Sequence, residues 1–305
     1  MKESASNHTD TLDNISYSLV KEAFETGEGF SKKELAGLTQ LPVKVVSQLI
    51  DRMLESGEIK KQGFDRFAIN KNHLHFLCIK IEPEKVERII FDATYSIVDR
   101  ADRAGVEKFD KTVDEVVAEV CKSYKLGCIA VSVQCAAKDG IIYKDSAAAF
   151  NLQAYLEQKY SVPAVVEKEI NLACFGEICG HEMQFLDDEY TVCLRLSNSG
   201  VQCSLVYKTN VLTGFQGKAG ASATANLIGN TKAGQEEAVL RAVKAVNSFF
   251  NPKTIIIYKD NADKAETENL KSCEEQNIVF AQDYEAKCQA GFVYLIKKKT
   301  AVFSW

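Results

Sequence analysis

Near the start of the chain, hydrophobic positions first recur with the spacing of a helix and then alternate as they do in strands. Ser31 followed by Glu34 has the form of a capping box and predicts a short helix. A second apolar stripe predicts another helix, which ends at Gly57 in a left-handed cap. Residues 58–62 and 66–69 then predict a two-stranded hairpin. The residues of the second stripe are Val46, Leu49, Ile50, Met53 and Leu54.

This order of elements predicts a winged helix-turn-helix DNA-binding domain at residues 1–72. The second helix would turn polar side chains toward base edges in the major groove, and the hairpin would hold the phosphate backbone with basic side chains. The alternative is a small helical bundle whose outer face is simply solvated. The expected base-reading residues are Lys44, Ser47 and Gln48, and the expected phosphate contacts are Lys60, Lys61 and Arg66.

The charge of this segment changes how it would have to bind DNA. Residues 1–72 hold ten Lys and Arg against eleven Asp and Glu, and Asp51 lies on the presumed reading face. Bulk attraction to phosphate is therefore absent, so binding would depend on local charge placement and on pairing of two modules. Such regulators usually place two recognition helices about 34 Å apart. We therefore expect a homodimer or a dimer of dimers, held by apolar surface of the larger domain.

From His73 onward the pattern is that of an α/β domain, assigned to residues 73–305. Three short strands in a meander precede a helix, a strand, a helix, a strand and a helix, and a similar order then recurs. This repetition predicts two lobes with mixed sheets, one at about 73–182 together with the C-terminal helix, and one at 183–283. Strands are expected at 75–83, 86–94, 95–102, 127–135, 162–170, 190–197, 202–209 and 254–259, and helices at 111–124, 151–160, 171–179, 235–249 and 284–297.

Composition adds limits on location and on metals. The 305 residues carry a formal charge of −5 and ten cysteines that form no C-x-x-C pair, which favours reduced thiols and a cytoplasmic protein. No apolar stretch is long enough to span a bilayer, so no membrane partner is expected. Cys174, Cys179 and His181 are close in sequence, but their spacing does not suit zinc, and we expect no metal.

Residues 165–177 read VVEKEINLACFGE, and residues 251–257 read NPKTIII. The first segment resembles Val-x-Glu-Asn-Asp and the second Asn-Pro-Glu-x-Ile-x-Ile, two segments of the ROK family of sugar kinases and sugar-responsive repressors. Residues 205–214 follow the family's hairpin, and residues 217–220 follow its Ala-Gly-Glu-Ile-Gly-His segment. The resemblance covers nearly the whole chain. It implies an actin-like, ribonuclease H-like domain of two lobes, and repressor members carry a winged helix-turn-helix in front of it.

The phosphate loops of the family are missing from this chain. Residues 80–85 stand where the family has Asp-x-Gly-Gly-Thr-Lys, and Pro83 there has no N–H to offer a phosphate. Residues 198–202 replace the second glycine loop, and Tyr258-Lys259 replace the Gly-Gly on the adenosine side. The resemblance therefore implies no ATP binding, no cofactor and no enzymatic activity.

The sugar side of the resemblance has also changed. Glu169 stands where kinase members have the aspartate that acts as general base, and Lys168 replaces the preceding asparagine. A ligand cleft, if retained, would contain Lys168, Glu169 and Asn171. The plainer alternative is a surface or hinge carboxylate paired with Lys168. Ala221 and Thr224 replace a sugar-binding Glu and a zinc-binding His.

These observations favour a DNA-binding transcriptional regulator with a catalytically inactive ROK-type domain for sensing and dimerisation. Its partners would be operator DNA, a second copy of the chain and a small carbohydrate-like effector. One alternative is a sugar kinase with altered motifs, and another is a protein-interaction scaffold that does not bind DNA.

Overall fold

The structure of the protein is a computed structural model. It describes residues 3–25, 29–82, 84–104, 109–144, 148–181, 189–197, 200–219, 235–259 and 277–302.

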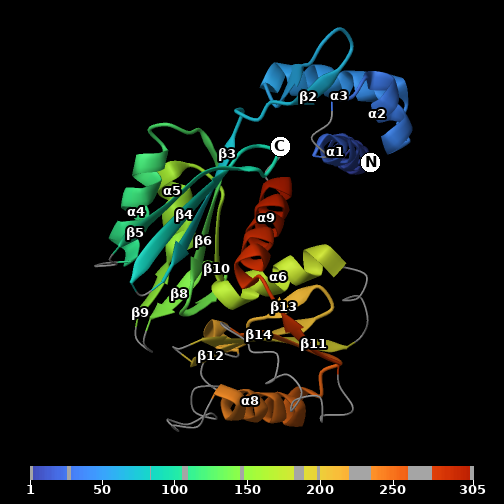
Figure 1. The fold of residues 1–305 in the computed structure, drawn as a ribbon. Helices are drawn as coiled ribbons and strands as arrows, with labels where there is room; N and C mark the ends of the chain where they lie inside the picture. Colours follow the sequence, from blue (N-terminus) through green and yellow to red (C-terminus); the bar gives the residue numbers. More distant parts are fainter. Residues whose placement is uncertain are drawn as a thin grey trace.

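The N-terminal part consists of three helices and a two-stranded sheet (Figure 1). Ser31 and Glu34 form the expected capping box at the start of α2, with Glu34 N–H donating to the Ser31 hydroxyl and Ser31 N–H donating to the Glu34 carboxylate at 2.7 Å. Gly57 ends α3 with a φ of 80°, as the left-handed cap requires. The elements are α1 (Glu3–Phe24), α2 (Lys32–Thr39), α3 (Val43–Ser56), β1 (Ile59–Lys61) and β2 (Phe67–Ile69).

One small core holds these elements together. The apolar stripe of α3 faces inward at Val46 and Ile50, and it meets Leu35 of α2 and Phe24 of α1. The backbone of Phe30 exchanges two hydrogen bonds with Phe67, so the segment before α2 is tied to the hairpin. The expected order of helices and hairpin is therefore confirmed.

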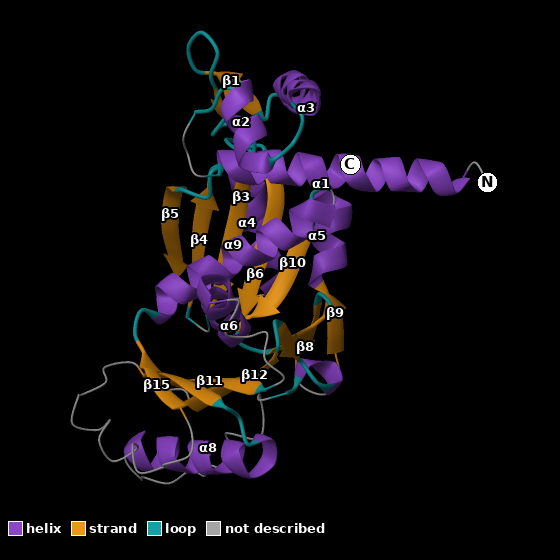
Figure 2. Ribbon diagram, turned by 90° about the vertical axis from the view of Figure 1, so that its right-hand side faces the viewer, coloured by secondary structure: helices purple, strands orange, loops and turns teal. Residues whose placement is uncertain are grey.

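The next unit is a five-stranded mixed sheet in the order β10-β6-β3-β4-β5. The β3, β4 and β5 strands are antiparallel, whereas β6 and β10 run parallel to β3. Helices α4 and α5 cover one face of this sheet (Figure 2). The bounds are β3 His75–Ile81, β4 Lys85–Phe91, β5 Ile97–Ala104, β6 Leu126–Val133, β10 Ala164–Lys168, α4 Phe109–Val120 and α5 Leu152–Tyr160.

A second five-stranded mixed sheet follows, in the order β13-β12-β11-β14-β15. Helix α8 covers its outer face, where Val243 and Val246 pack against alternating apolar residues of β11 and β14. The two mixed sheets confirm the expected α/β class. The bounds are β11 Tyr190–Ser197, β12 Gly200–Tyr207, β13 Asn210–Leu212, α8 Gln235–Phe250, β14 Thr254–Lys259 and β15 Asn277–Ala281.

Two helices, α6 (Glu169–His181) and α9 (Tyr284–Val302), lie between the sheets and share one core with both of them (Figure 1). Their backbones touch at two glycines. A Cβ atom on Gly176 would lie 2.1 Å from the Lys287 carbonyl oxygen, and one on Gly291 would lie 2.0 Å from that of Leu172. Because a larger residue at either position would force the helices apart, the glycines let α6 and α9 cross with their backbones in contact.

Several short strands were not predicted from the pattern. The strands β7 (Ala136–Lys138), β8 (Ile141–Lys144) and β9 (Ala148–Asn151) form a small sheet of their own, and β13 and β15 extend the second sheet. Segments of three to five residues are too short to show a reliable period. Within the described residues, no helix is both long and apolar enough to cross a membrane.

Candidate functional site

The polar face of α3 is the first candidate site. Lys44 and Gln48 are exposed and form no hydrogen bond or ion pair within the described residues. Ser47 is half-buried, and its hydroxyl accepts a hydrogen bond of 2.8 Å from the Lys32 ammonium. The helix thus places the three expected base-reading residues on one side, with Ser47 already engaged by a side chain from α2.

Lys32 is a residue that the sequence pattern did not single out. Its ammonium also lies 3.2 Å from the Asp51 carboxylate, which is the acidic group on the presumed reading face. The negative charge of Asp51 is therefore opposed from within the module, at a largely exposed pair where the interaction is weak. Only the crossing of α2 over α3 brings Lys32 to this place.

The hairpin holds the remaining three basic residues in different ways. Lys60 and Lys61 are exposed neighbours on β1, and successive strand residues point to opposite faces, so the two extend to opposite sides of the hairpin. Arg66 instead folds back, donating to the Gly29 carbonyl and lying 3.2 Å from Glu34. Hydrogen bonds from Ser31, together with Arg66, lower the pKa of Glu34.

The second candidate site is the place where α6 and α9 begin. Glu169, the first residue of α6, is only 1% exposed, and Lys80 of β3 is 4% exposed. The Lys80 ammonium lies 2.9 Å from Glu169, 3.0 Å from Glu82 and 2.5 Å from Glu285 in the first turn of α9. Burial alone would lower the pKa of Lys80, but Glu169 and Glu285 outweigh it and raise that pKa.

Arg195 extends this cluster to the second sheet. Its guanidinium lies 2.9 Å from the same oxygen of Glu169 that Lys80 contacts, and it covers the ring of Tyr284 at 4.1 Å. The other Glu169 oxygen accepts a hydrogen bond of 3.1 Å from Gln134. We name Lys80, Glu169, Arg195 and Glu285 the inter-lobe cluster, because its members come from both sheets and from both central helices.

The expected surface pairing of Glu169 with Lys168 is wrong. Lys168 is buried and points the other way, donating to the Ala219 carbonyl at 2.9 Å, and burial lowers its pKa. Asn171 is also buried, and its amide bridges Glu167 and Ser204 at 2.7 Å each. Strand β10 and helix α6 meet between Lys168 and Glu169, and this change of backbone direction separates the two side chains.

The space at these residues is small. The described residues enclose a cavity of about 50 Å³ beside Lys168, Glu169, Gln134 and Gln202, and a water molecule occupies about 30 Å³ of liquid. Pockets for small organic ligands usually measure about 300–1,000 Å³. Of the expected cleft residues, Lys168 and Glu169 line this cavity, whereas Asn171 does not.

The segments expected to replace the nucleotide loops form contacts within the protein itself. In the turn from β3 to β4, the Glu82 N–H donates to the Lys85 carbonyl and so is not available to a phosphate. Tyr258, which was expected to replace a glycine of the Gly-Gly motif, is a buried side chain whose hydroxyl donates to Glu177 at 2.5 Å. Pro83, Asn198, Ser199, Ala221 and Thr224 lie outside the described residues.

This geometry limits what Glu169 can do chemically. Three of the roughly four lone-pair positions of its carboxylate are occupied by Lys80, Arg195 and Gln134. Glu82, Glu169 and Glu285 could together hold a metal ion by their spacing, but the Lys80 ammonium already supplies a positive charge among them. A substrate hydroxyl could reach Glu169 only if this cluster opened.

Comparison with models of known protein families gave no match, and comparison with curated protein sequences gave none either. Comparison with solved structures gave many matches. The fold is that of ROK proteins. A ROK family transcriptional regulator, a homologue of the E. coli MLC protein, has a TM-score of 0.62 at 12% identity, and the match covers 95% of this chain and 99% of that one.

Other matches with the ROK fold cover less of this chain. A ROK family protein from Streptococcus pneumoniae, solved with sucrose, has a TM-score of 0.55, and a ROK hexokinase from Thermus thermophilus has one of 0.53. Each is 16% identical, and each match covers 74% of this chain and 100% of the other.

Proposed function

We propose that this chain is a DNA-binding transcriptional regulator whose ROK-fold domain has no phosphoryl-transfer activity. The observation that carries the proposal is a difference in coverage. The ROK regulator matches 95% of the chain, whereas the hexokinase matches 74% over its entire own length. The regulator therefore has a counterpart for about a fifth of this chain that the hexokinase lacks, which is roughly the size of the N-terminal module.

In this proposal residues 30–69 form a winged helix-turn-helix. Helix α3 buries one face in the core of the module and leaves Lys44 and Gln48 exposed on the other, which is what a recognition helix needs in a major groove. Lys60 would then contact phosphate. The ion pair of Lys32 with Asp51 lowers the electrostatic cost of bringing that face to DNA.

The absence of kinase chemistry is supported by the inter-lobe cluster. A general base must accept a proton from a substrate hydroxyl within hydrogen-bond reach. Glu169 is instead held by two cations and is almost fully buried. A sugar-like effector would need the same space, and the cavity of about 50 Å³ is too small for one without rearrangement.

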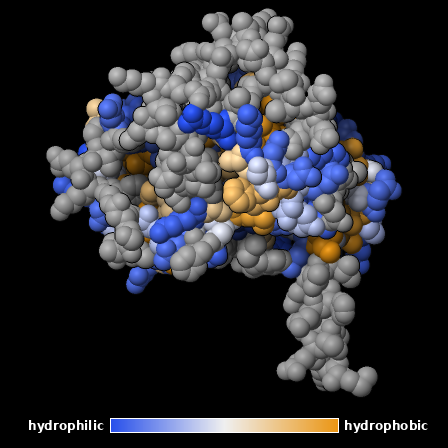
Figure 3. Space-filling model, turned by 90° about the horizontal axis from the view of Figure 1, so that it is seen from below, coloured by the Kyte–Doolittle hydropathy of each residue, from blue (hydrophilic) through white to orange (hydrophobic). Residues whose placement is uncertain are grey.

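Dimerisation would use the second lobe. Phe249 is 74% exposed at the end of α8, and Phe250 and Tyr190 lie beside it with their rings 6.4 Å apart. Figure 3, which views the molecule from the side of α8, shows hydrophobic side chains in the middle of this face and hydrophilic ones along part of their border. An apolar centre with a polar rim is the usual form of an interface between protein copies.

A gel-shift titration with the DNA upstream of the chain's own gene tests DNA binding directly. Gln48→Ala is expected to cost about 1–3 kcal/mol at one base pair and to relax sequence preference there. Lys60→Ala is expected to weaken binding to all DNA sequences alike. It should also lower the slope of the logarithm of the binding constant against the logarithm of the salt concentration by about one unit. Matched controls are Gln158→Ala on the exposed side of α5 and Lys85→Ala on β4.

The alternatives give different results in the same assays. A protein-interaction scaffold would show no gel shift with any duplex at low salt. The Gln48→Ala variant would then behave in the gel shift like the Gln158→Ala control. A kinase with altered motifs would bind Mg-ATP and phosphorylate a hexose. Either result would replace the regulator proposal.

A further inference from the structure

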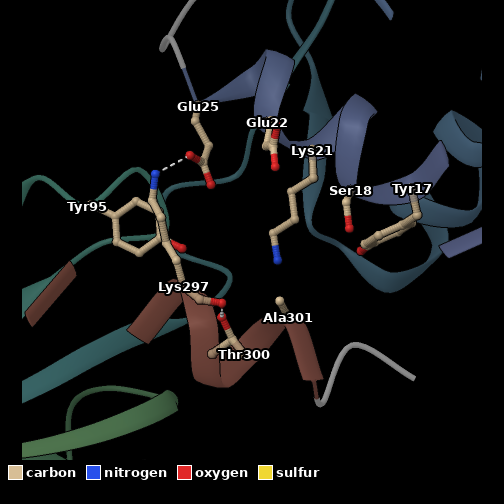
Figure 4. Close-up of a pocket in the computed structure, with 9 residues that line it drawn as sticks. All are labelled: Tyr17, Ser18, Lys21, Glu22, Glu25, Tyr95, Lys297, Thr300 and Ala301. Carbon is tan, nitrogen blue, oxygen red and sulfur yellow. Dashed lines mark hydrogen bonds and ion pairs between the residues drawn. The ribbon is translucent and has the colours of Figure 1, made fainter. Parts of the chain in front are cut away.

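The junction between the N-terminal module and the first sheet contains two adjoining cavities. Their volumes are about 380 and 410 Å³, and both are lined by Tyr17, Lys21, Tyr95 and Thr300. Figure 4 shows the first one: Lys21 extends from α1 toward the last turns of α9, and Glu25 lies beside Lys297. These volumes are in the range of small-molecule sites, unlike the space at Glu169.

The wall of the larger cavity is mostly apolar and comes from both sides of the junction. Met53 belongs to α3, whereas Phe76 belongs to β3 and Pro163 precedes β10. Tyr95 stacks on Phe76 with ring centroids 5.2 Å apart, and the Lys297 ammonium lies 4.8 Å from the Tyr95 ring. Lys297 also pairs with Glu25, so α9 contacts α1 at the edge of the cavities.

The described lining residues of the larger cavity carry more positive than negative charge, whereas in the smaller cavity Lys21 and Lys297 are balanced by Glu22 and Glu25. Glu58 is the only acidic residue among the described lining residues of the larger cavity. The Glu58 carboxylate accepts hydrogen bonds from the Tyr17 and Ser56 hydroxyls. Lys21 forms no ion pair or hydrogen bond within the described residues, and the Arg52 guanidinium lies 5.3 Å from the Tyr17 ring centroid. Burial lowers the pKa of His73, which keeps it neutral near pH 7.

We propose that this junction binds a small organic anion with an aromatic body, its anionic group between Lys21 and Arg52 and its ring against the apolar wall. Such a ligand would contact α1, α3 and the first sheet at once, so it would favour one placement of the N-terminal module over others. The consequence for DNA binding rests on the proposed function, whereas the binding itself does not. The effector site would then be this junction instead of the cleft at Glu169.

Two fluorescent probes of nearly the same shape test the proposal. 8-Anilinonaphthalene-1-sulfonate carries the negative charge, and N-phenyl-1-naphthylamine lacks it. We expect the wild-type chain, without DNA, to bind the sulfonate at one site and at least tenfold more tightly than the neutral probe. Lys21→Met combined with Arg52→Met should remove this preference and leave the affinity for the neutral probe unchanged.

Control variants separate the cavity from other apolar surface. Lys33→Met, on an exposed lysine of α2, should bind both probes like wild type. Ala93→Phe, which places a ring in the larger cavity, should weaken both probes at least tenfold. Unchanged sulfonate binding in the double variant or in Ala93→Phe would overturn the proposal, as would equal affinities of the two probes for wild type. Circular dichroism identifies the variants that are folded. If Ala93→Phe does not fold, the double variant at Lys21 and Arg52 still tests the proposal.

A gel shift with and without the sulfonate then separates this site from the proposed function. If wild type binds DNA, saturating sulfonate is expected to change that affinity at least threefold, and the double variant should not respond. If wild type binds no DNA while the fluorescence results are as expected, the regulator proposal fails and the anion site stands.

Discussion

Replacing Lys80 with methionine tests the inter-lobe cluster most directly. Methionine is similar in length but has no charge, so it leaves Glu169 and Glu285 facing each other without the ammonium that lies 2.9 and 2.5 Å from them. Arg195 remains as the other cation on Glu169. The variant therefore removes one of the two cations, and leaves the Gln134 hydrogen bond, at an almost fully buried carboxylate.

The size of the effect follows from burial. Removing one partner of a buried ion pair costs about 3–5 kcal/mol, because the other charge stays desolvated without compensation. Glu285 is 50% exposed, so its share of the loss is of the order of 0–1 kcal/mol. Since Arg195 still compensates Glu169 in part, we expect Lys80→Met to lower the free energy of unfolding by about 3 kcal/mol. This is a large part of the roughly 5–15 kcal/mol that stabilises a typical domain.

Urea unfolding followed by far-UV circular dichroism measures this change. The carboxylates raise the pKa of Lys80 above its usual 10.5, so its stabilisation is complete below that pH and is lost only above it. The difference between wild type and Lys80→Met should therefore be the same at pH 7 and pH 9. The control is Lys85→Met, whose half-exposed side chain lies 3.8 Å from Asp102 and should contribute less than about 0.5 kcal/mol. Equal losses in the two variants would refute the view that burial makes the pair of Lys80 and Glu169 contribute more to stability than an exposed pair.

Three further predictions concern chemistry, assembly and pH. Calorimetry with Mg-ATP should detect no binding, because the Glu82 N–H and the Tyr258 side chain use the space and the donors that a nucleotide needs; micromolar affinity would contradict this. Deleting residues 1–72 should leave the sedimenting species dimeric, whereas Phe249→Ser should give monomers; a monomeric deletion variant would place the interface in the N-terminal module. Burial lowers the pKa of His75 below its usual 6.5, so this residue destabilises the fold as the pH falls through 6.5, when the unfolded chain takes up the proton first. His75→Leu should therefore reduce the loss of unfolding free energy between pH 7.5 and pH 5.5, and an unchanged loss would show that other groups cause it.

Much of the N-terminal module could be predicted because its signals are local. The capping box of Ser31 and Glu34 spans three residues, and the apolar stripe of α3 lies within three turns of one helix. Gly57 ends that helix through its own backbone conformation. Each of these features depends on residues only a few positions apart, so each can be predicted from the sequence alone.

The buried strands of the ROK fold are also visible in the sequence as apolar runs, and one of them contains a single lysine. Lys80 is the one charged residue in β3, all of whose residues are buried. A cation in such a strand needs an anionic partner nearby. The pattern shows that a partner must exist, but it does not say which of the 42 acidic residues it is.

Only the tertiary structure decided which residues pair with Lys80 and Glu169. Glu285 is 205 positions from Lys80, and Arg195 is 26 positions from Glu169, and these residues meet because two glycines let α6 and α9 cross with their backbones in contact. The same holds for Lys32 beside Asp51 and for Lys21 and Tyr95 at the junction. By itself the sequence determined the local elements. Which charge lies next to which depends on the packing of distant elements, because attraction between charges acts over a few ångströms in space and not along the chain.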